Sequence, residues 1–537
     1  MLNIYDKERM ISVKRIIALS LALALLAGCG APAPKTPETE TTAPTGTVRF
    51  AEETRIRLSD NGIAVEGDES AVYTANDIIY YEEGHDFTYG EGEPGEAHGT
   101  EEAAKHIVVH IVKPGTYVLS GRLSAGQIAV DLGEGAEDDP EAVVNLVLNG
   151  LDITCGIAPA VIFYNVYECG SADAPSALVD TSAAGANVYL AEGTVNTVTG
   201  SHVAKIYKPE TVELSEDGTE VEEAKKLHKY DGAFYSRMSL NMDGAGELNI
   251  IADNEGLDSE MHLTVNGGKI NIFSGNDGIN TNEDGVSVTT VNGGELTVTV
   301  TGETGEGDGI DSNGWLVING GIVTAAACAT SGDGGIDSDM GIHLNGGTVL
   351  ASGSMLDRIG ESTENYAVFT FAGRQTGGTE FSLKNADGQT VLTHAPANDF
   401  SILIVSGLAE GEYTLWQGEI RLAGSAGQGS GGGMPGGMMP SEGFVPGERP
   451  EGETVPMPEG NEPPGFDGGR PPEFDGKQPP EFEEQIPPMP DGQAPIAPEA
   501  PREPRPGGFG GEADAELSDV FTVTPGGCYF CNIQPVQ

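Results

Sequence analysis

Basic residues are scarce in this chain of 537 residues. It has 27 Lys and Arg against 83 Asp and Glu, which gives a formal net charge of −56 at pH 7. Nucleic-acid binding depends on Lys and Arg side chains that neutralise phosphates, so the composition argues against a nucleic-acid partner. Aromatic residues make up only 6% of the chain, with two Trp among them. Few side chains are therefore available to stack on a flat ligand.

Long hydrophobic runs are also missing, except for residues 16–26, which follow two basic residues near the N-terminus. This run is too short for a transmembrane helix and is typical of a secretory signal. It ends in a Leu-Ala-Gly-Cys motif at Cys29 that is similar to the lipoprotein box of bacteria. We expect residues 1–29 to be a lipoprotein signal peptide and Cys29 to be lipidated; an ordinary cleaved signal peptide is the alternative. The protein would then lie on the extracellular face of the bacterial cytoplasmic membrane, held by its lipid anchor.

Cysteine is rare, with six residues in the whole chain. Cys155 and Cys169 lie fourteen residues apart, and disulfides are common in exported proteins. We therefore predict a disulfide between them. Cys528 and Cys531 form a CxxC motif in sequence that resembles a strand, where a local or inter-chain disulfide is favoured over a redox role.

What the sequence does contain is a repeat between residues 231 and 347. Each copy has an acid, Gly, an aliphatic residue, Asp or Asn, and Ser or Thr, followed by Asn-Gly-Gly. The triplets begin at Asn266, Asn292, Asn319 and Asn345, so they are 26, 27 and 26 residues apart. A period of this length indicates a solenoid, and the alternating, β-branched-rich segments between glycines indicate short strands. The unit suits one coil of a parallel β-helix, and glycine would supply the positive φ needed at its corners.

The order of further motifs carries a family resemblance. The segments KPGTYVLSGRL, LVLNGLDIT and ANVYLAEGTVNTVTG precede the repeats. Over residues 55–355 this series resembles bacterial carbohydrate-binding β-helix proteins of the secreted clostridial type, which are related in shape to pectate lyases. The resemblance implies an all-β, right-handed parallel β-helix that binds calcium and cell-wall polysaccharides, including acidic ones.

Together, composition and resemblance divide the chain into segments. After the signal peptide we expect a Pro/Thr-rich tether (30–48) and an acidic N-terminal cap region (49–105). The carbohydrate-binding β-helix would span 106–355, and a β-rich cap or sandwich 356–424. A disordered Gly/Pro/Met/Glu-rich linker (425–515) and a strand-like terminal segment with the CxxC motif (516–537) complete the chain.

Calcium binding can also be argued from the residues themselves. Calcium takes six to eight oxygen ligands, and strands of neighbouring coils lie about 4.8 Å apart, close enough for an ion to bridge two coils. The repeats contain 18 Asp or Glu between residues 231 and 340 against only Arg237 and Lys269, so stacked acids would repel without a cation. An Asn/Asp ladder that caps corners by hydrogen bonds to the backbone is the alternative. The expected metal ligands are Asp258, Glu260, Asn280, Asn282, Asp311, Asn313, Asp337 and Asp339, with a second column of acids before the glycines at Glu255, Asp277, Asp308 and Asp333.

Two aromatic residues could stack on a sugar ring. Trp315 follows the Ser-Asn-Gly of the third copy, and Tyr235 occupies the matching place in a degenerate copy; core packing is the alternative for such a Trp. Because an acidic polysaccharide would be repelled by this chain, calcium would have to bridge the two. We therefore expect a surface-anchored, non-catalytic protein that binds polysaccharide. The alternatives are a polysaccharide lyase, with Arg237 or Lys269 as its base, and a structural adhesin.

Overall fold

The computed structural model describes residues 53–170, 175–427 and 517–536. Their regular structure is almost entirely β, which confirms the expected all-β class. The expected signal peptide with Cys29, the tether and nearly all of the 425–515 segment lie outside these residues. In the described part of the chain, no helix has both the length and the apolar character to cross a membrane.

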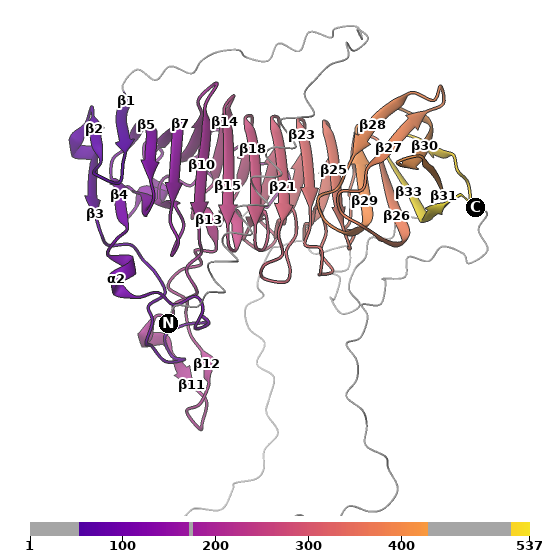
Figure 1. Cartoon of the computed structure of the whole chain (residues 1–537). Coiled ribbons are helices and arrows are strands. Elements are labelled where there is room, and N and C mark those ends of the chain that lie inside the picture. Colours follow the sequence, from indigo (N-terminus) through magenta and orange to yellow (C-terminus); the bar gives the residue numbers. More distant parts are fainter. Residues whose placement is uncertain (1–52, 171–174, 428–516, 537) are drawn as a thin grey trace, which may run out of the picture. The chain divides into compact units, whose positions relative to one another are not determined.

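A first ladder of parallel strands runs through the molecule, and Figure 1 shows its members side by side. It starts before residue 106, within the region expected as an acidic cap. Its strands are β1 (Glu53–Leu58), β5 (Gly115–Leu123), β7 (Val144–Thr154), β10 (Val195–Gly200), β15 (Glu247–Ala252), β18 (Lys269–Ser274), β21 (Glu295–Val300), β23 (Ile322–Ala326) and β25 (Thr348–Gly353), each paired in parallel with the next.

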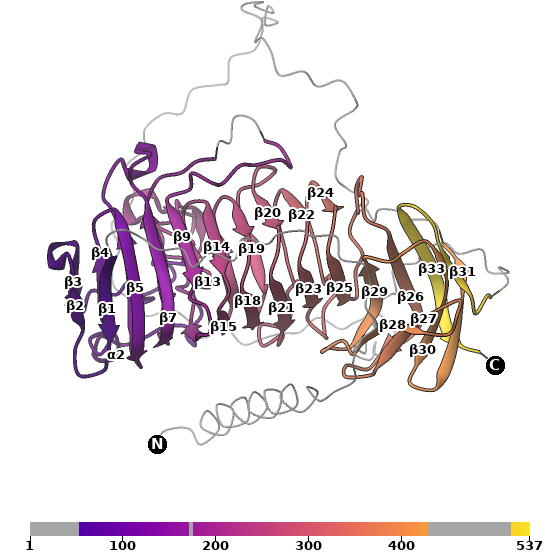
Figure 2. The same ribbon diagram turned by 90° about the horizontal axis from the view of Figure 1, so that it is seen from above.

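The structure contains a second and a third ladder of parallel strands, and Figure 2 brings strands of the second ladder into view. Starting from β7, the second ladder continues through β9 (Ala186–Leu190), β14 (Leu240–Gly244), β17 (Leu263–Val265), β20 (Val288–Val291), β22 (Trp315–Ile318) and β24 (Gly341–Leu344). The third ladder contains β4 (Ile107–Ile111), β6 (Gly126–Asp131), β8 (Val161–Asn165), β13 (Gly232–Ser236), β16 (Glu255–Ser259) and β19 (Ile279–Thr281).

The repeat explains this stacking. The chain passes from β16 in the third ladder to β17 in the second and β18 in the first, and then begins the next copy. Equivalent positions pair directly: Leu257 lies beside Ile279 and Ser259 beside Thr281. All four of these side chains are fully buried, so each copy covers the apolar surface of its neighbour.

Glycine is required at two positions of the repeat for two different structural reasons. A Cβ on Gly278, just before the buried aliphatic residue, would lie 2.0 Å from Val298 Cγ1 of the first ladder, so the core has no room for a side chain there. The second glycine of the triplet turns the chain in the left-handed region, as at Gly294 with φ +83°. The preceding Asn is not left-handed. Its side chain instead bonds to the Asn of the next copy.

A terminal β unit follows the last coil, and its antiparallel pairing makes the sheets mixed. β25 pairs antiparallel with β29, and β33 lies between β26, to which it is parallel, and β31. Stacked and edge-to-face rings of Phe369, Phe521 and Phe530 form part of its core. The strands are β26 (Tyr366–Gln375), β27 (Phe381–Asn385), β28 (Thr390–His394), β29 (Phe400–Ser406), β30 (Gly411–Gln417), β31 (Ile420–Ala426), β32 (Phe521–Val523) and β33 (Gly527–Pro535).

Short elements lie around the ladders. β2 and β3 add antiparallel partners to β1 and β4, and β11 and β12 form a separate hairpin. These elements are β2 (Ala64–Glu66), η1 (Glu69–Ala71), β3 (Val72–Ala75), α2 (Thr100–Ala103), η2 (Ala136–Asp138), η3 (Pro209–Thr211), β11 (Glu213–Leu214) and β12 (Val221–Glu223).

The predicted disulfide between Cys155 and Cys169 is wrong for this structure, in which both thiols are free. Cys155 directly follows β7 and is fully buried in the core, whereas Cys169 lies beyond β8 of the third ladder and is half-buried. The residues between the two cysteines therefore lead from one ladder to another and do not form a loop that a disulfide would close. Cys528 and Cys531, both on β33, are free as well.

Candidate functional site

Carboxylates and amides line one face of the third ladder. Asp258 on β16 pairs in register with Tyr235 on β13 and Asn280 on β19. Its side chain is fully buried. Oδ1 accepts a hydrogen bond from Asn282 Nδ2 at 2.7 Å, while Oδ2 has no partner among the described residues. A buried carboxylate oxygen without a donor is costly, so this position calls for a ligand or a proton.

Glu255 and Asn280 extend this arrangement. Asn280 Nδ2 donates to Glu255 Oε1 at 3.1 Å, and both residues are more than nine-tenths buried. Glu255 Oε2 and Asn280 Oδ1 have no hydrogen-bond partner within the described ranges. We call Glu255, Asp258 and Asn280 the Asp258 cluster. It holds three buried oxygens, two from carboxylates and one from an amide, that nothing in the described chain satisfies.

Burial dominates the electrostatics of this cluster. It raises the pKa of Asp258 well above its ordinary value, and the neighbouring Glu255 raises it further. The pKa of Glu255 is raised in the same way, by burial first and then by the charge of Asp231. Both pKa shifts have the same meaning: without a bound ligand, the cluster disfavours the state in which Glu255 and Asp258 are both ionised.

A second group of acids lies further along the chain. It consists of Asp277, Asp308, Asp311, Asp337 and Asp357, and we call it the Asp311 cluster. Burial, and then neighbouring acids, raise the pKa of Asp308 to about 9 and those of Asp311 and Asp337 to about 7. For Asp277 burial raises the pKa to about 6 despite a hydrogen bond from the Asp308 backbone N–H. Asp357, outside the repeat, belongs to this cluster because its charge raises the pKa of Asp337.

Basic side chains compensate the clusters only weakly: Lys205 and Lys229 lower the pKa of Glu255 and Asp258, respectively, less than burial and neighbouring acids raise it. The ion pairs within the described ranges do not include Asp258 or Asp311, nor any other carboxylate of the two clusters. At the same time, no three His, Cys, Asp or Glu side chains of the described chain converge closely enough to hold a metal ion by themselves. The clusters therefore offer partial oxygen shells rather than a complete protein cage.

The structure groups the expected metal ligands unequally. Asp258 and Asn280 lie in one cluster with Asn282 bonded to it, whereas Asp311 and Asp337 lie in the other, with Asp339 among their charged neighbours. The remaining two have protein partners: Glu260 Oε1 accepts from the Tyr235 hydroxyl at 2.8 Å, and Asn313 Nδ2 donates to Asp284 Oδ1 at 2.9 Å.

Some acids of the second column fit the structural alternative. The carboxylates of Asp277 and Asp308 accept hydrogen bonds from the backbone N–H groups of Asp308 and Gly334 in the next coil. Sequence reasoning placed Glu255 only in this second column, and it missed Asp357 entirely. Asp357 follows the last copy, so no periodic signal could have pointed to it.

Of the two aromatic residues expected to bind sugar, Tyr235 is ruled out. Its ring is 1% exposed and packs edge-to-face against Tyr230, so it offers no face to a ligand. Tyr235 shares its register position with Asp258 and Asn280. It lies on the face opposite to the apolar Phe234, and it is buried there because Tyr230 packs over it. Trp315 is half-buried at the start of β22, on the second ladder rather than beside the Asp258 cluster. Its role stays a prediction.

Comparisons with known proteins agree with the family that the sequence resembles. A carbohydrate-binding domain-containing protein of Acetivibrio thermocellus is 28% identical over 165 residues, which cover 30% of this chain and 44% of that protein. The match thus spans less than half of the relative's length. No solved structure matches the chain. The family model of carbohydrate-binding domain-containing proteins matches residues 105–391, more than half of the chain, from the strands of the early coils into the terminal β unit. The chain therefore belongs to the family of carbohydrate-binding domain-containing proteins.

Proposed function

We propose that this protein is a surface-anchored, non-catalytic carbohydrate-binding protein whose coils form a right-handed parallel β-helix and bind acidic polysaccharide through calcium. The observation that carries the calcium is the Asp258 cluster. Glu255 Oε2, Asp258 Oδ2 and Asn280 Oδ1 are buried and unpartnered within the described chain. Lipidation at Cys29 would provide the anchor.

The donor set fits calcium. Calcium prefers carboxylate and amide oxygens and takes six to eight of them, whereas the cluster offers three. Water and the carboxylates of a bound uronic acid polymer would fill the remaining positions, and the polymer would have to displace side chains that bury the cluster. Bound there, the ion would neutralise Glu255 and Asp258 and lower the cost of burying their charges.

Charge gives the same ion a second role. At a net charge of −56, the protein repels an acidic polymer at every approach. A cation shared between protein carboxylates and uronate carboxylates converts that repulsion into a bridge. Metal and polysaccharide are thus expected to bind together, each strengthening the affinity for the other.

The two candidate bases of a lyase have other partners. Arg237 Nη1 donates to Tyr164 O at 3.3 Å and to Asn165 Oδ1 at 3.1 Å. Lys269 lies on the first ladder, where its Nζ is 3.5 Å from Glu247 Oε2. These contacts support binding without cleavage.

The test is retention of the purified protein on immobilised polygalacturonate, with calcium or with a chelator, while unsaturated product is followed by absorbance. We expect retention with calcium, loss with chelator and no product. Asp258→Asn should weaken calcium-dependent retention at least about tenfold, as loss of a group at a metal site does. Glu295→Gln, which removes an exposed acid on the first ladder, should leave retention unchanged.

Product formation would identify a lyase and contradict the proposal. Retention that persists in chelator would contradict the calcium bridge. Equal effects of Asp258→Asn and Glu295→Gln on retention would show that retention depends only on net charge.

A further inference from the structure

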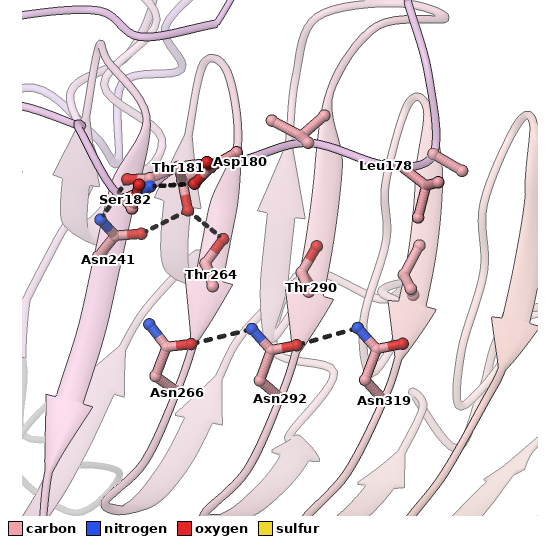
Figure 3. A pocket seen from close by; sticks show the side chains of 13 residues that line it. Leu178, Asp180, Thr181, Ser182, Asn241, Thr264, Asn266, Thr290, Asn292 and Asn319 are labelled. Carbon is pink, nitrogen blue, oxygen red and sulfur yellow. Dashed lines mark hydrogen bonds between the residues drawn. The ribbon is translucent and has the colours of Figure 1, made fainter.

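A groove of about 380 Å³ lies on the second ladder, away from both acid clusters. Its floor is formed by outward side chains of β14, β17, β20 and β22, and the segment 177–182 runs along one side (Figure 3). This volume is within the range of ligand-binding pockets. The lining residues are Ala177, Leu178, Val179, Asp180, Thr181, Ser182, Asn241, Thr264, Asn266, Thr290, Asn292, Val317 and Asn319.

The floor of the groove carries a row of bonded amides. Asn292 Nδ2 donates to Asn266 Oδ1 at 2.9 Å, and Asn319 Nδ2 donates to Asn292 Oδ1 at 2.9 Å (Figure 3). Asn345 continues the row by donating to Asn319 at 3.0 Å, but it does not line the groove. We call these four residues the amide ladder.

The amide ladder leaves hydrogen-bonding capacity on every coil. A side-chain amide has two N–H donors and two oxygen lone pairs. Within the ladder, Asn292 uses one N–H to Asn266 and one lone pair to Asn319. One donor and one acceptor therefore remain on an exposed residue, and the same pair recurs about every 4.8 Å along the stacked strands.

Other groups of the groove extend this pattern. Among the described residues no hydrogen bond engages the half-buried Thr290 hydroxyl, whereas Thr264 accepts from Thr181 at 2.7 Å. Leu178 is 85% exposed at the rim and offers an apolar surface above the polar floor (Figure 3). A polar row beneath an apolar rim fits a molecule with hydroxyl edges and C–H faces.

The groove is nearly uncharged in a strongly acidic protein. Asp180 is its one ionisable lining residue, and Asp180 Oδ1 accepts a hydrogen bond from the Ser182 backbone at 3.0 Å. No acid cluster of the third ladder contributes to the lining. A ligand held here needs no cation to overcome repulsion.

We infer that Asn266, Asn292 and Asn319 of the amide ladder, together with Thr290 and Leu178, form a metal-independent binding site for a neutral, linear, hydroxyl-rich oligosaccharide chain. Sugar hydroxyls both donate and accept, so they match the donor and acceptor that each coil presents, and a coil spacing is comparable to the length of one sugar unit. This inference deepens the proposed function and rests on it, because it assigns a second glycan-binding surface, of different charge preference, to the same protein.

The test uses isothermal titration calorimetry of the intact protein in chelator, with cellohexaose, xylohexaose and mannohexaose as probes. We expect at least one probe to bind. Asn292→Ala removes the central amide of the groove and should weaken binding at least about tenfold, the equivalent of about 1.4 kcal/mol. Thr290→Val should weaken it in the same direction. Asn345→Ala, which breaks the same amide ladder outside the groove, should leave affinity unchanged.

Thermal unfolding of the variants separates binding from folding: Asn292→Ala removes two amide–amide hydrogen bonds and Asn345→Ala removes one, so both should lower Tm only slightly and leave the protein folded at the titration temperature. Failure of all three probes to bind, or equal loss of affinity in the two Asn variants, would overturn the inference. Calcium-dependent retention of the unsubstituted protein on polygalacturonate keeps the two proposals apart: retention with no neutral binding rejects this groove alone, whereas neutral binding without retention rejects the acidic-polymer site alone.

Discussion

Individual buried acids decide how the stability of this protein depends on pH. In the folded protein the pKa of Asp311 and of Asp337 is about 7, because burial and then neighbouring acids disfavour ionisation; their ordinary value is 3.8. Above about pH 4 the unfolded chain therefore binds fewer protons than the folded one. The free energy of unfolding falls as pH rises to about 7, and Asp308, with a pKa of about 9, extends the fall.

We accordingly predict, for protein in chelator, a Tm that decreases between pH 5 and pH 8, measured by circular dichroism. Asp308→Asn should raise Tm at pH 8 and flatten this dependence, because the amide keeps an oxygen for the Gly334 backbone N–H without a charge. Calcium should restore Tm at pH 8 in the unsubstituted protein. A Tm that rises with pH in chelator would contradict this account of the clusters.

At the scale of the strands, the glycine before each buried aliphatic residue is set by the opposite sheet. Gly278→Ala would place a Cβ 2.0 Å from Val298 Cγ1, and overpacking of this kind costs about 1–3 kcal/mol. The same substitution at a control position, Gly332→Ala, should cost little, because Gly332 precedes the last copy and has open space around it. Urea unfolding would compare the two variants, and equal midpoints would show that β19 and β21 can shift apart freely.

The repeat made the stacking of strands predictable, because identical positions recur and must fall in register. Leu257 beside Ile279 and Ser259 beside Thr281 follow directly from that rule. The same reasoning placed Asp258 and Asn280 together in the candidate site. It could not find Asp357, which belongs to no copy, or the segment 177–182, which reaches the second ladder from outside the repeat.

Predictions that needed distances across the coil were less successful. Alternation along a strand does not say which outward positions other segments cover, so Tyr235 was expected at the surface and is buried against Tyr230. Spacing along the chain does not say which ladder a cysteine joins, so Cys155 and Cys169 were paired and are free. The spacing of the triplets likewise does not say that the Asn of each copy bonds the Asn of its neighbour.

For the whole molecule, the terminal β unit covers the end of the stacked coils by pairing β29 antiparallel to β25. Phe530 anchors it, with ring centroids 5.4 Å from Phe369 and 5.0 Å from Phe521. Phe530→Ala should cost about 3–5 kcal/mol and expose the edge of the coils to association. Light scattering during heating would show earlier aggregation than in a Val536→Ala control, whose side chain is 47% exposed. Unchanged scattering would show that the unit is not needed to protect that edge.

The position of β33 has a consequence for the timing of assembly. Its residues, Gly527–Pro535, insert between β26 and β31, which come about a hundred residues or more earlier in the chain. The coils can stack as they emerge, because each contacts only its neighbours. The terminal unit must wait until residue 535 has been synthesised. During synthesis the protein therefore passes through an interval with stacked strands and an unfinished end, when a chaperone or a neighbouring chain has its best access to the edge.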